Sequence, residues 1–204
     1  MRAPLAPASR LLRSPYVKAL LPFFFAFGCQ KHEVAAANEP SIRLGLLPHV
    51  DAATELREQA PFAVYLEGAT GAHVDMNIGK SYASMVDAIC GGEDDVVQLG
   101  GLTYLQAAER CGVVPIVQRD VDQTFHSLFI TAADSPIHAL KDLAGHSFAF
   151  GSPDSASGHL MPAYFMAKEG VDPAVTARAV YSGGHDKTAA QVAAKKVDAG
   201  ALSE

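Results

Sequence analysis

The stretch GSPDSASGHLMP at residues 151–162 carries the clearest chemical signal in the chain. It follows an apolar run that predicts a buried strand and precedes a predicted helix, so the first N–H groups of that helix have no partner within it. The helix dipole adds partial positive charge there, which favours a bound anion. Ser155 and Ser157 bring hydroxyl donors, Ala156 brings a backbone N–H, and Gly158 lets a ligand approach the backbone.

The stretch contains no lysine or arginine, so it predicts an oxyanion site made of neutral donors. The alternative is an ordinary helix cap, because serine and aspartate are common at that position.

Four more side chains lie at predicted junctions between a strand and a helix. Tyr82 directly follows an expected cap, so its phenol can reach the same crevice; the alternative is an aromatic ring packed on the sheet. His185 follows two glycines and can donate one hydrogen bond, or add charge when protonated; the alternative is an exposed loop histidine. Thr103 and Tyr104 follow Gly100-Gly101 and are expected at the same crevice.

A hydrolase site is a weaker interpretation of these residues. Ser155 or Ser157 could act as nucleophile with His185 as base and Asp186 as its orienting partner. Neighbouring side chains on one helix point about 100° apart, so Asp186 would orient His185 poorly. The chain also has no G-x-S-x-G motif, no H-E-x-x-H motif and no phosphate-binding or dinucleotide glycine pattern. We therefore expect no enzyme, no metal and no cofactor.

Hydrophobic periodicity predicts an α/β protein with two lobes, residues 41–124 and 125–204, that contain mostly parallel sheets with helices on both faces. Pro61 is expected to kink or split the first helix. In such sheets, ligands bind beyond the carboxyl ends of the strands. The predicted strands are 41–47, 72–78, 95–99, 113–118, 125–131, 146–150, 177–181 and 197–202, and the predicted helices are 52–68, 82–89, 102–110, 140–145, 158–169 and 185–195.

Residues 1–29 predict an export signal. The first part is basic, and the apolar run at 19–27 is too short to span a membrane. The sequence AFGC resembles a bacterial lipobox, so Cys29 is the expected lipidation site and the lipid would attach the protein to a membrane; export without a lipid is the alternative. Residues 30–40 are small and polar and are expected to form a tether.

Cys90 and Cys111 form an even pair once Cys29 is assigned to lipidation. Each falls at the end of a predicted helix. In an oxidising compartment they can form a disulfide, and two buried thiols are the alternative. The formal net charge of −6 argues against nucleic acid as a partner.

The chain resembles the solute-binding proteins of phosphate, phosphite and phosphonate ABC importers, which are type 2 periplasmic binding proteins. The similarity lies in Ser81-Tyr82 at a helix start and in the segments "DVVQLGGLTYLQA", "DSPIHALKDLAGHSFAFGSPDSASGHLMP" and "YSGGHDKTAAQVAAKKVDAGAL". The DSP and LKDLAG elements occur widely in type 2 proteins and indicate the fold. The S-x-S-G loop followed by proline, with the later S-G-x-H, is more specific to the phosphonate branch.

This resemblance implies a two-lobed clamp that closes on an oxyanion. It implies that Ser155, Ser157, His185 and Tyr82 hold the ligand oxygens. Ala156 stands where the family often has a hydroxyl residue, so one side-chain donor is absent. The resemblance also implies a periplasmic protein that delivers its ligand to an ABC permease in the inner membrane, and we expect a monomer.

The chain is short for two α/β lobes of roughly 100–150 residues each. We therefore expect the second lobe to be incomplete and the chain to be a fragment or a truncated product. Two alternatives to an importer component stay open: an oxyanion sensor that partners a membrane histidine kinase, and a degenerate lipoprotein that binds no ligand.

Overall fold

The computed structural model describes residues 39–173 and 179–204. The expected export signal, Cys29 and the tether up to residue 38 lie outside the described residues, as do the first two residues of the strand predicted at 177–181. Within the described ranges, no helix has the length and apolar character needed to cross a membrane. The described elements form two sheets with helices packed on their faces.

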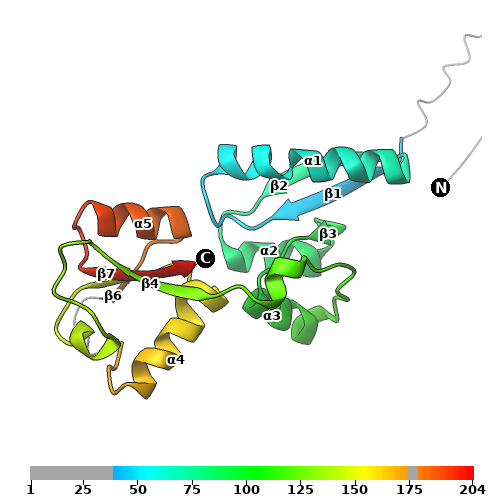
Figure 1. Ribbon diagram of the computed structural model, residues 1–204. Coiled ribbons are helices and arrows are strands. Elements are labelled where there is room, and N and C mark those ends of the chain that lie inside the picture. Colours follow the sequence, from blue (N-terminus) through cyan, green and yellow to red (C-terminus); the bar gives the residue numbers. More distant parts are fainter. Residues whose placement is uncertain (1–38, 174–178) are drawn as a thin grey trace, which may run out of the picture. The chain divides into compact units, whose positions relative to one another are not determined.

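The first sheet has three parallel strands in the order β2-β1-β3, with β1 at Ser41–Leu46, β2 at His73–Ile78 and β3 at Val96–Val97. Its helices are α1 (Ala52–Thr70), α2 (Tyr82–Gly91) and α3 (Gly101–Cys111). Side chains alternate along β1, so Leu44 and Leu46 pack with α1 while Leu47 packs with Met85 of α2. Figure 1 shows α1 and α2 on opposite faces of this sheet.

Local capping residues set the helix boundaries of the first sheet. Asp51 accepts hydrogen bonds from Ala53 N and Thr54 N at the start of α1, and Ser81 and Ser84 form a reciprocal cap at the start of α2. Pro61 does not split α1, which continues through it to Thr70. The missing proline N–H removes one helical hydrogen bond, and the turns on both sides of it hold.

The strand predicted at 113–118 is wrong. This segment is extended but pairs with no described strand, and Val114, Ile116 and Val117 are each about three-quarters exposed. The apolar pattern was that of a buried strand, but Pro115 has no N–H to donate to a ladder. The adjoining strand β3 is also shorter than its predicted range of 95–99.

The second sheet has four strands in the order β4-β7-β5-β6. β5 (Phe148–Phe150) runs parallel to β6 (Ala179–Tyr181) and to β7 (Ala199–Ser203), and β4 (Ser127–Thr131) is antiparallel to β7. This mixed, mostly parallel arrangement confirms the predicted fold class. Short helices η1 (Asp120–Gln123) and η2 (Leu140–Leu143) precede β4 and β5.

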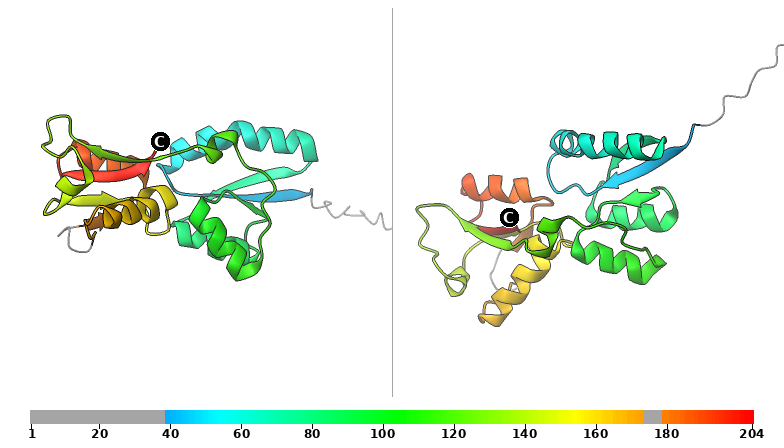
Figure 2. Two further views of the ribbon diagram at one scale, coloured as in Figure 1. Left: turned by 60° about the horizontal axis from the view of Figure 1, so that its bottom comes forward. Right: turned by 45° about the vertical axis from the view of Figure 1, so that its right-hand side comes forward.

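Helices α4 (Met161–Lys168) and α5 (His185–Ala193) cover opposite faces of the second sheet, as the views in Figure 2 show. The alternation along β5 explains this layering. Phe148 and Phe150 are buried with Met166 of α4, and Ala149 is buried with Val192 of α5. The large aromatic side chains therefore fill one face of the sheet, and an alanine lets α5 pack closely on the other.

Cys90 and Cys111 are joined by a disulfide, with their Cα atoms 5.6 Å apart. The bond connects the last turn of α2 to the end of α3. Both alternatives were open in the sequence, and the structure has the disulfide.

Candidate functional site

The loop after β5 leads into a short π-helical segment, η3 (Ala156–Leu160), which continues into α4. Ser155 caps this segment, because its Oγ accepts a hydrogen bond from Gly158 N at 2.9 Å. Ser155 and Ser157 are 3% and 6% exposed. Among the described residues, the N–H groups of Ala156 and Ser157 have no partner, as expected in the first turn of a helix. The segment therefore buries hydroxyl and N–H donors together.

Gly158 lies at a tightly packed point of this segment. A Cβ at this position would lie 3.1 Å from Gly151 Cα and 3.1 Å from Cε1 of the His185 ring. The Gly151 N–H also donates to Gly158 O at 2.8 Å. The missing side chain therefore makes room for His185 and for the facing backbone, and the approach of a ligand to this backbone stays a prediction.

Tyr82 combines its two predicted roles. Its ring is buried with Leu47 and Met85 beside the first sheet, and its hydroxyl lies close to the Ser155 side chain. Burial raises the pKa of Tyr82 to about 12, although the Ser155 side chain lowers it in part. The phenol therefore stays protonated at physiological pH and keeps a donor for an anion.

His185, the first residue of α5, presents one defined tautomer. Its Nδ1 accepts a hydrogen bond from Ser203 N at 3.3 Å, so the proton of the neutral ring lies on Nε2. Burial, together with the nearby charge of His49, lowers the pKa of His185 from 6.5 to about 4. The ring is therefore neutral at physiological pH and offers a single Nε2–H donor.

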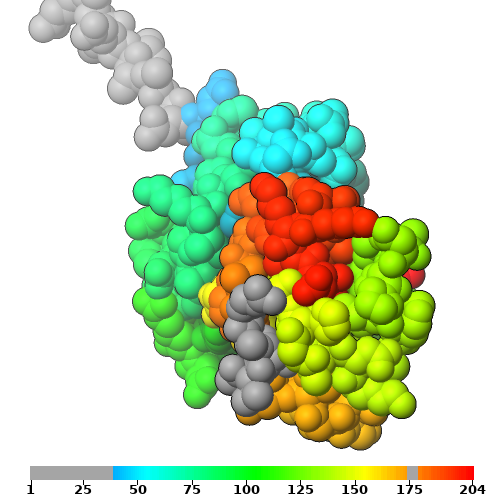
Figure 3. All heavy atoms as spheres, turned by 90° about the vertical axis from the view of Figure 1, so that its left-hand side faces the viewer, coloured from blue at the N-terminus to red at the C-terminus, as the bar shows by residue number. Residues whose placement is uncertain are grey.

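Three contacts connect the elements that carry these residues. The first is the approach of the Tyr82 hydroxyl to the Ser155 side chain, and the second is a hydrogen bond from Gln106 Nε2 on α3 to Asp154 Oδ1 at 3.0 Å. In the third, the backbone N–H of His185 donates to His49 O at 2.9 Å. On the face drawn in Figure 3, the orange and red residues, which include α5 and β7, adjoin cyan residues near the start of α1.

The residues at the start of α3 are placed differently. Thr103 is fully buried, and its Oγ1 donates to Gly100 O at 3.0 Å within its own helix. Tyr104 is half-buried and has no side-chain hydrogen bond among the described residues. The helix start does adjoin the serine-rich loop, because a Cβ at Gly101 would lie 3.9 Å from Ala156 Cβ. Ligand binding by Thr103 and Tyr104 stays a prediction.

The structure adds two groups that the sequence did not single out as parts of this site. Glu55 is fully buried, whereas the next residue, Leu56, is 38% exposed. The Glu55 Oε2 atom lies 3.1 Å from His49 Nδ1. Leu56, Ala60, Ala63 and Leu66 have the spacing of an apolar helix face, so no local signal marks Glu55 as the buried residue. Its burial depends on the contact with His49 in the loop after β1.

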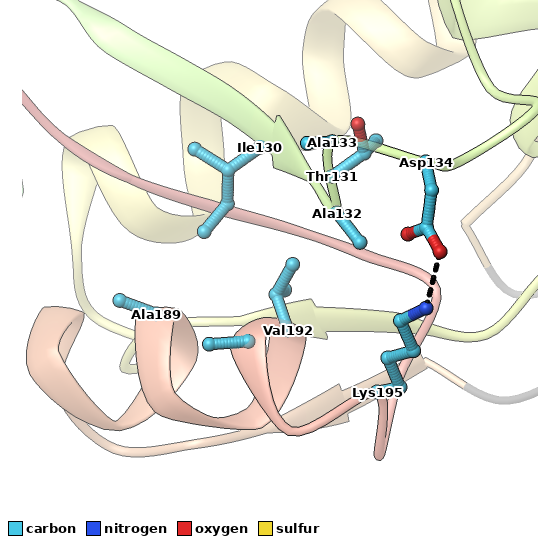
Figure 4. A pocket seen from close by; sticks show the side chains of 9 residues that line it. Ile130, Thr131, Ala132, Ala133, Asp134, Ala189, Val192 and Lys195 are labelled. Atoms are coloured by element: carbon cyan, nitrogen blue, oxygen red, sulfur yellow. Dashed lines mark hydrogen bonds and ion pairs between the residues drawn. The ribbon is translucent and has the colours of Figure 1, made fainter.

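A surface pocket lies away from these residues. It has a volume of about 460 Å³, lies between β4 and α5, and is crossed by an ion pair between Asp134 and Lys195, as Figure 4 shows. A smaller pocket of about 220 Å³ is lined by residues of α2 and α3 and by Asp154 of the serine-rich loop. In the described part of the chain, no cluster of three histidine, cysteine or acidic side chains could hold a metal ion.

Comparisons with known proteins identify a family. Residues 44–204 match the family model described as the periplasmic substrate-binding protein of phosphonate ABC transporters. The probable phosphite-binding protein PhnD1 of an ABC transporter from Prochlorococcus marinus (strain MIT 9301) is 40% identical over 119 residues, which cover 54% of this chain and 40% of that protein. The phosphonates-binding periplasmic protein of Escherichia coli (strain K12) is 28% identical over 173 residues, or 80% of this chain and 51% of the relative.

A solved structure extends the similarity to three dimensions. The structure of PhnD1 from Prochlorococcus marinus in complex with methylphosphonate superposes with a TM-score of 0.75 and 31% sequence identity. The match covers 79% of this chain and 63% of that one. In these three matches, the chain thus spans between 40% and 63% of the length of the relative.

Proposed function

Since this chain belongs to the family of periplasmic substrate-binding proteins of phosphonate ABC transporters, we propose that it captures a phosphorus oxyanion and delivers it to an ABC permease. The ligand would be a phosphonate, phosphite or phosphate. In this function the protein binds and releases its ligand without catalysing a reaction, because the family consists of binding proteins.

The observation that carries the proposal is the cluster of neutral donors around the start of η3. Ser155 and Ser157 are buried there, the Tyr82 hydroxyl lies close to Ser155, and the His185 ring lies against Gly158. Each hydrogen bond to a charged group contributes about 1.5–3 kcal/mol, and a micromolar dissociation constant corresponds to about 8 kcal/mol. Four or five such donors would therefore supply enough gross energy, part of which offsets desolvation and domain closure.

In this proposal the ligand oxygens come between the neighbouring side chains of Tyr82 and Ser155, so that both hydroxyls and the Ser157 hydroxyl turn toward the anion. The N–H groups of Ala156 and Ser157 and the Nε2–H of His185 complete the donor set. Residues 41–124 and 125–204 would form the two lobes that close on the ligand. The protein would act in the periplasm as a monomer, attached to the membrane through a lipid on Cys29.

Calorimetric titration of the purified protein with methylphosphonate, phosphite, phosphate and sulfate tests the proposal. Circular dichroism first establishes that the protein is folded. We expect saturable binding of at least one phosphorus oxyanion and none of sulfate. A folded protein that binds none of the phosphorus oxyanions would contradict the proposed function. Loss of growth on the bound compound as sole phosphorus source, after deletion of the gene, would show that the protein serves import.

A further inference from the structure

Glu55 is a buried acidic residue beside a site that we assign to an anion. In the described part of the chain, two side chains approach its carboxylate: Gln59 Nε2 donates to Oε1 at 3.2 Å, and His49 Nδ1 lies 3.1 Å from Oε2. Burial raises the pKa of Glu55, and His49 and the Gln59 hydrogen bond lower it in part. An ionised carboxylate at this place would oppose anion binding unless another charge or a proton compensates it.

His49 connects Glu55 to the candidate site in two ways. Its Nδ1 lies between two acceptors, Glu55 Oε2 and the carbonyl of Leu47 at 3.3 Å, so Nδ1 carries a proton. Its own carbonyl accepts the backbone N–H of His185 at 2.9 Å, and the two histidine ring centroids are 6.4 Å apart. His49 therefore contacts Glu55 through its ring and the start of α5 through its backbone carbonyl.

We propose that Glu55 is a positioning residue of the oxyanion site, which fixes His185 through His49, and that Glu55 and His49 together take up one proton when the anion binds. This inference rests on the proposed function. With that proton the pair has no net charge, either as carboxylate and imidazolium or as carboxylic acid and imidazole. Without it the pair carries one negative charge next to the ligand, so affinity falls as pH rises.

Few other groups near the pair can account for such a pH dependence. The pKa of Tyr82, about 12, and that of His185, about 4, both lie far from neutral pH. Arg119 stays charged at any relevant pH. The charged and titratable neighbours of the pair are Glu58 on α1, Arg119 before η1, Tyr82 on α2, and His185 and Asp186 on α5.

Two substitutions separate the charge of Glu55 from its positioning role. In Glu55→Gln the amide keeps the size of the side chain and a polar atom beside His49 Nδ1, but the acidic group is gone. In Glu55→Ala that polar atom is lost as well. Glu58→Gln, an exposed neighbour on the same helix, removes the same charge without touching His49 and serves as the matched control.

Calorimetric titration with methylphosphonate, in buffers of different ionisation enthalpy between about pH 6 and about pH 9, measures affinity and proton uptake together. We expect the unmodified protein and Glu58→Gln to take up more protons on binding than Glu55→Gln does. Protons that the ligand itself gains or loses are common to all three proteins, so they cancel in this difference. Glu55→Gln should keep its affinity near pH 6 and lose less of it by pH 9. Glu55→Ala should bind methylphosphonate about tenfold more weakly at every pH in this range, because the side chain that positions His49 is lost.

The outcomes separate the two proposals. If the unmodified protein binds methylphosphonate but Glu55→Gln takes up as many protons, and Glu55→Ala binds equally well, the role of Glu55 is refuted while the proposed function stands. If the unmodified, folded protein binds no phosphorus oxyanion, both proposals are refuted. Where Glu55→Ala does not fold, proton uptake by Glu55→Gln alone decides the matter.

Discussion

The start of η3 and the start of α3 have similar sequences but use their hydroxyl groups differently. Each follows a strand, each begins with small residues, and each has a hydroxyl side chain within its first turn. In η3, Ser155 binds Gly158 N and lies close to Tyr82, and Ser157 is buried without a side-chain partner among the described residues. In α3, Thr103 donates its only hydroxyl proton to Gly100 O.

This difference shows that a hydroxyl in the first turn of a helix is available to a ligand only if the backbone does not use its proton. The threonine side chain folds back on its own helix, a common local hydrogen bond for this residue. The serines of η3 belong to a π-helical segment, where the cap is made to Gly158 N and the serine acts as an acceptor. We therefore expect the start of η3 to bind and the start of α3 to stabilise.

Among the changes that test this comparison, loss of the disulfide at the end of α3 is expected to have the largest effect on stability. Replacing Cys90 and Cys111 together by serine should lower the free energy of unfolding by about 3 kcal/mol, because the bond closes a loop with a sequence separation of 21. Methylphosphonate affinity should stay within about twofold if α3 only supports the site. Denaturant unfolding of the unmodified protein under reducing conditions is the control and should match the double variant.

Ser157→Ala is expected to weaken anion binding tenfold or more, or about 1.4 kcal/mol, because a buried donor to the anion is lost. Thermal stability should change little, since the Ser157 hydroxyl has no partner among the described residues. Calorimetry measures the affinity. An unchanged dissociation constant would remove Ser157 from the site and make the two helix starts equivalent.

Thr103→Val should show the reverse pattern. The substitution keeps the shape of the side chain and removes the hydrogen bond to Gly100 O, which still accepts Tyr104 N at 2.8 Å. We expect a loss of about 1 kcal/mol in the free energy of unfolding and an affinity within about twofold of the original. A tenfold loss of affinity would instead place Thr103 in the site, as the sequence predicted.

Mild acidification tests the neutral state of His185 at the start of α5. Because its pKa in the folded protein, about 4, is below the ordinary value of 6.5, the unfolded chain binds the proton more readily. The contribution of His185 to stability is therefore complete above pH 6.5 and is lost as pH falls toward 4. His185→Asn, which can still accept from Ser203 N, should show a smaller loss in denaturant titrations over this range. Equal losses in both proteins would contradict a buried, neutral His185.

Local patterns predicted most helices and strands, because their caps and alternation are written in neighbouring residues. Ser81 at the start of α2 and the glycines that end α2 and α3 are examples. The strand predicted at 113–118 was wrong for a reason that is not local: pairing needs a neighbouring strand, and hydrophobicity alone does not supply one.

In the candidate site, too, the residues with local sequence markers were predicted and those without such markers were missed. Ser155, Ser157, Tyr82 and His185 stand next to glycines and caps that mark strand–helix junctions, so their types and spacing drew attention to them. Glu55 and His49 had no such marker. Their importance comes from the hydrogen bond between His49 O and His185 N, which joins residues far apart in the sequence.

The lack of lysine and arginine in the serine-rich loop has a consequence for behaviour in salt. A site made of basic side chains binds anions less well as ionic strength rises, because its long-range attraction is screened. Here the donors are short-range and neutral, while the chain as a whole carries a formal charge of −6 and repels an approaching anion. Salt screens that repulsion, so such a protein would capture its ligand at least as readily in brackish water as in fresh.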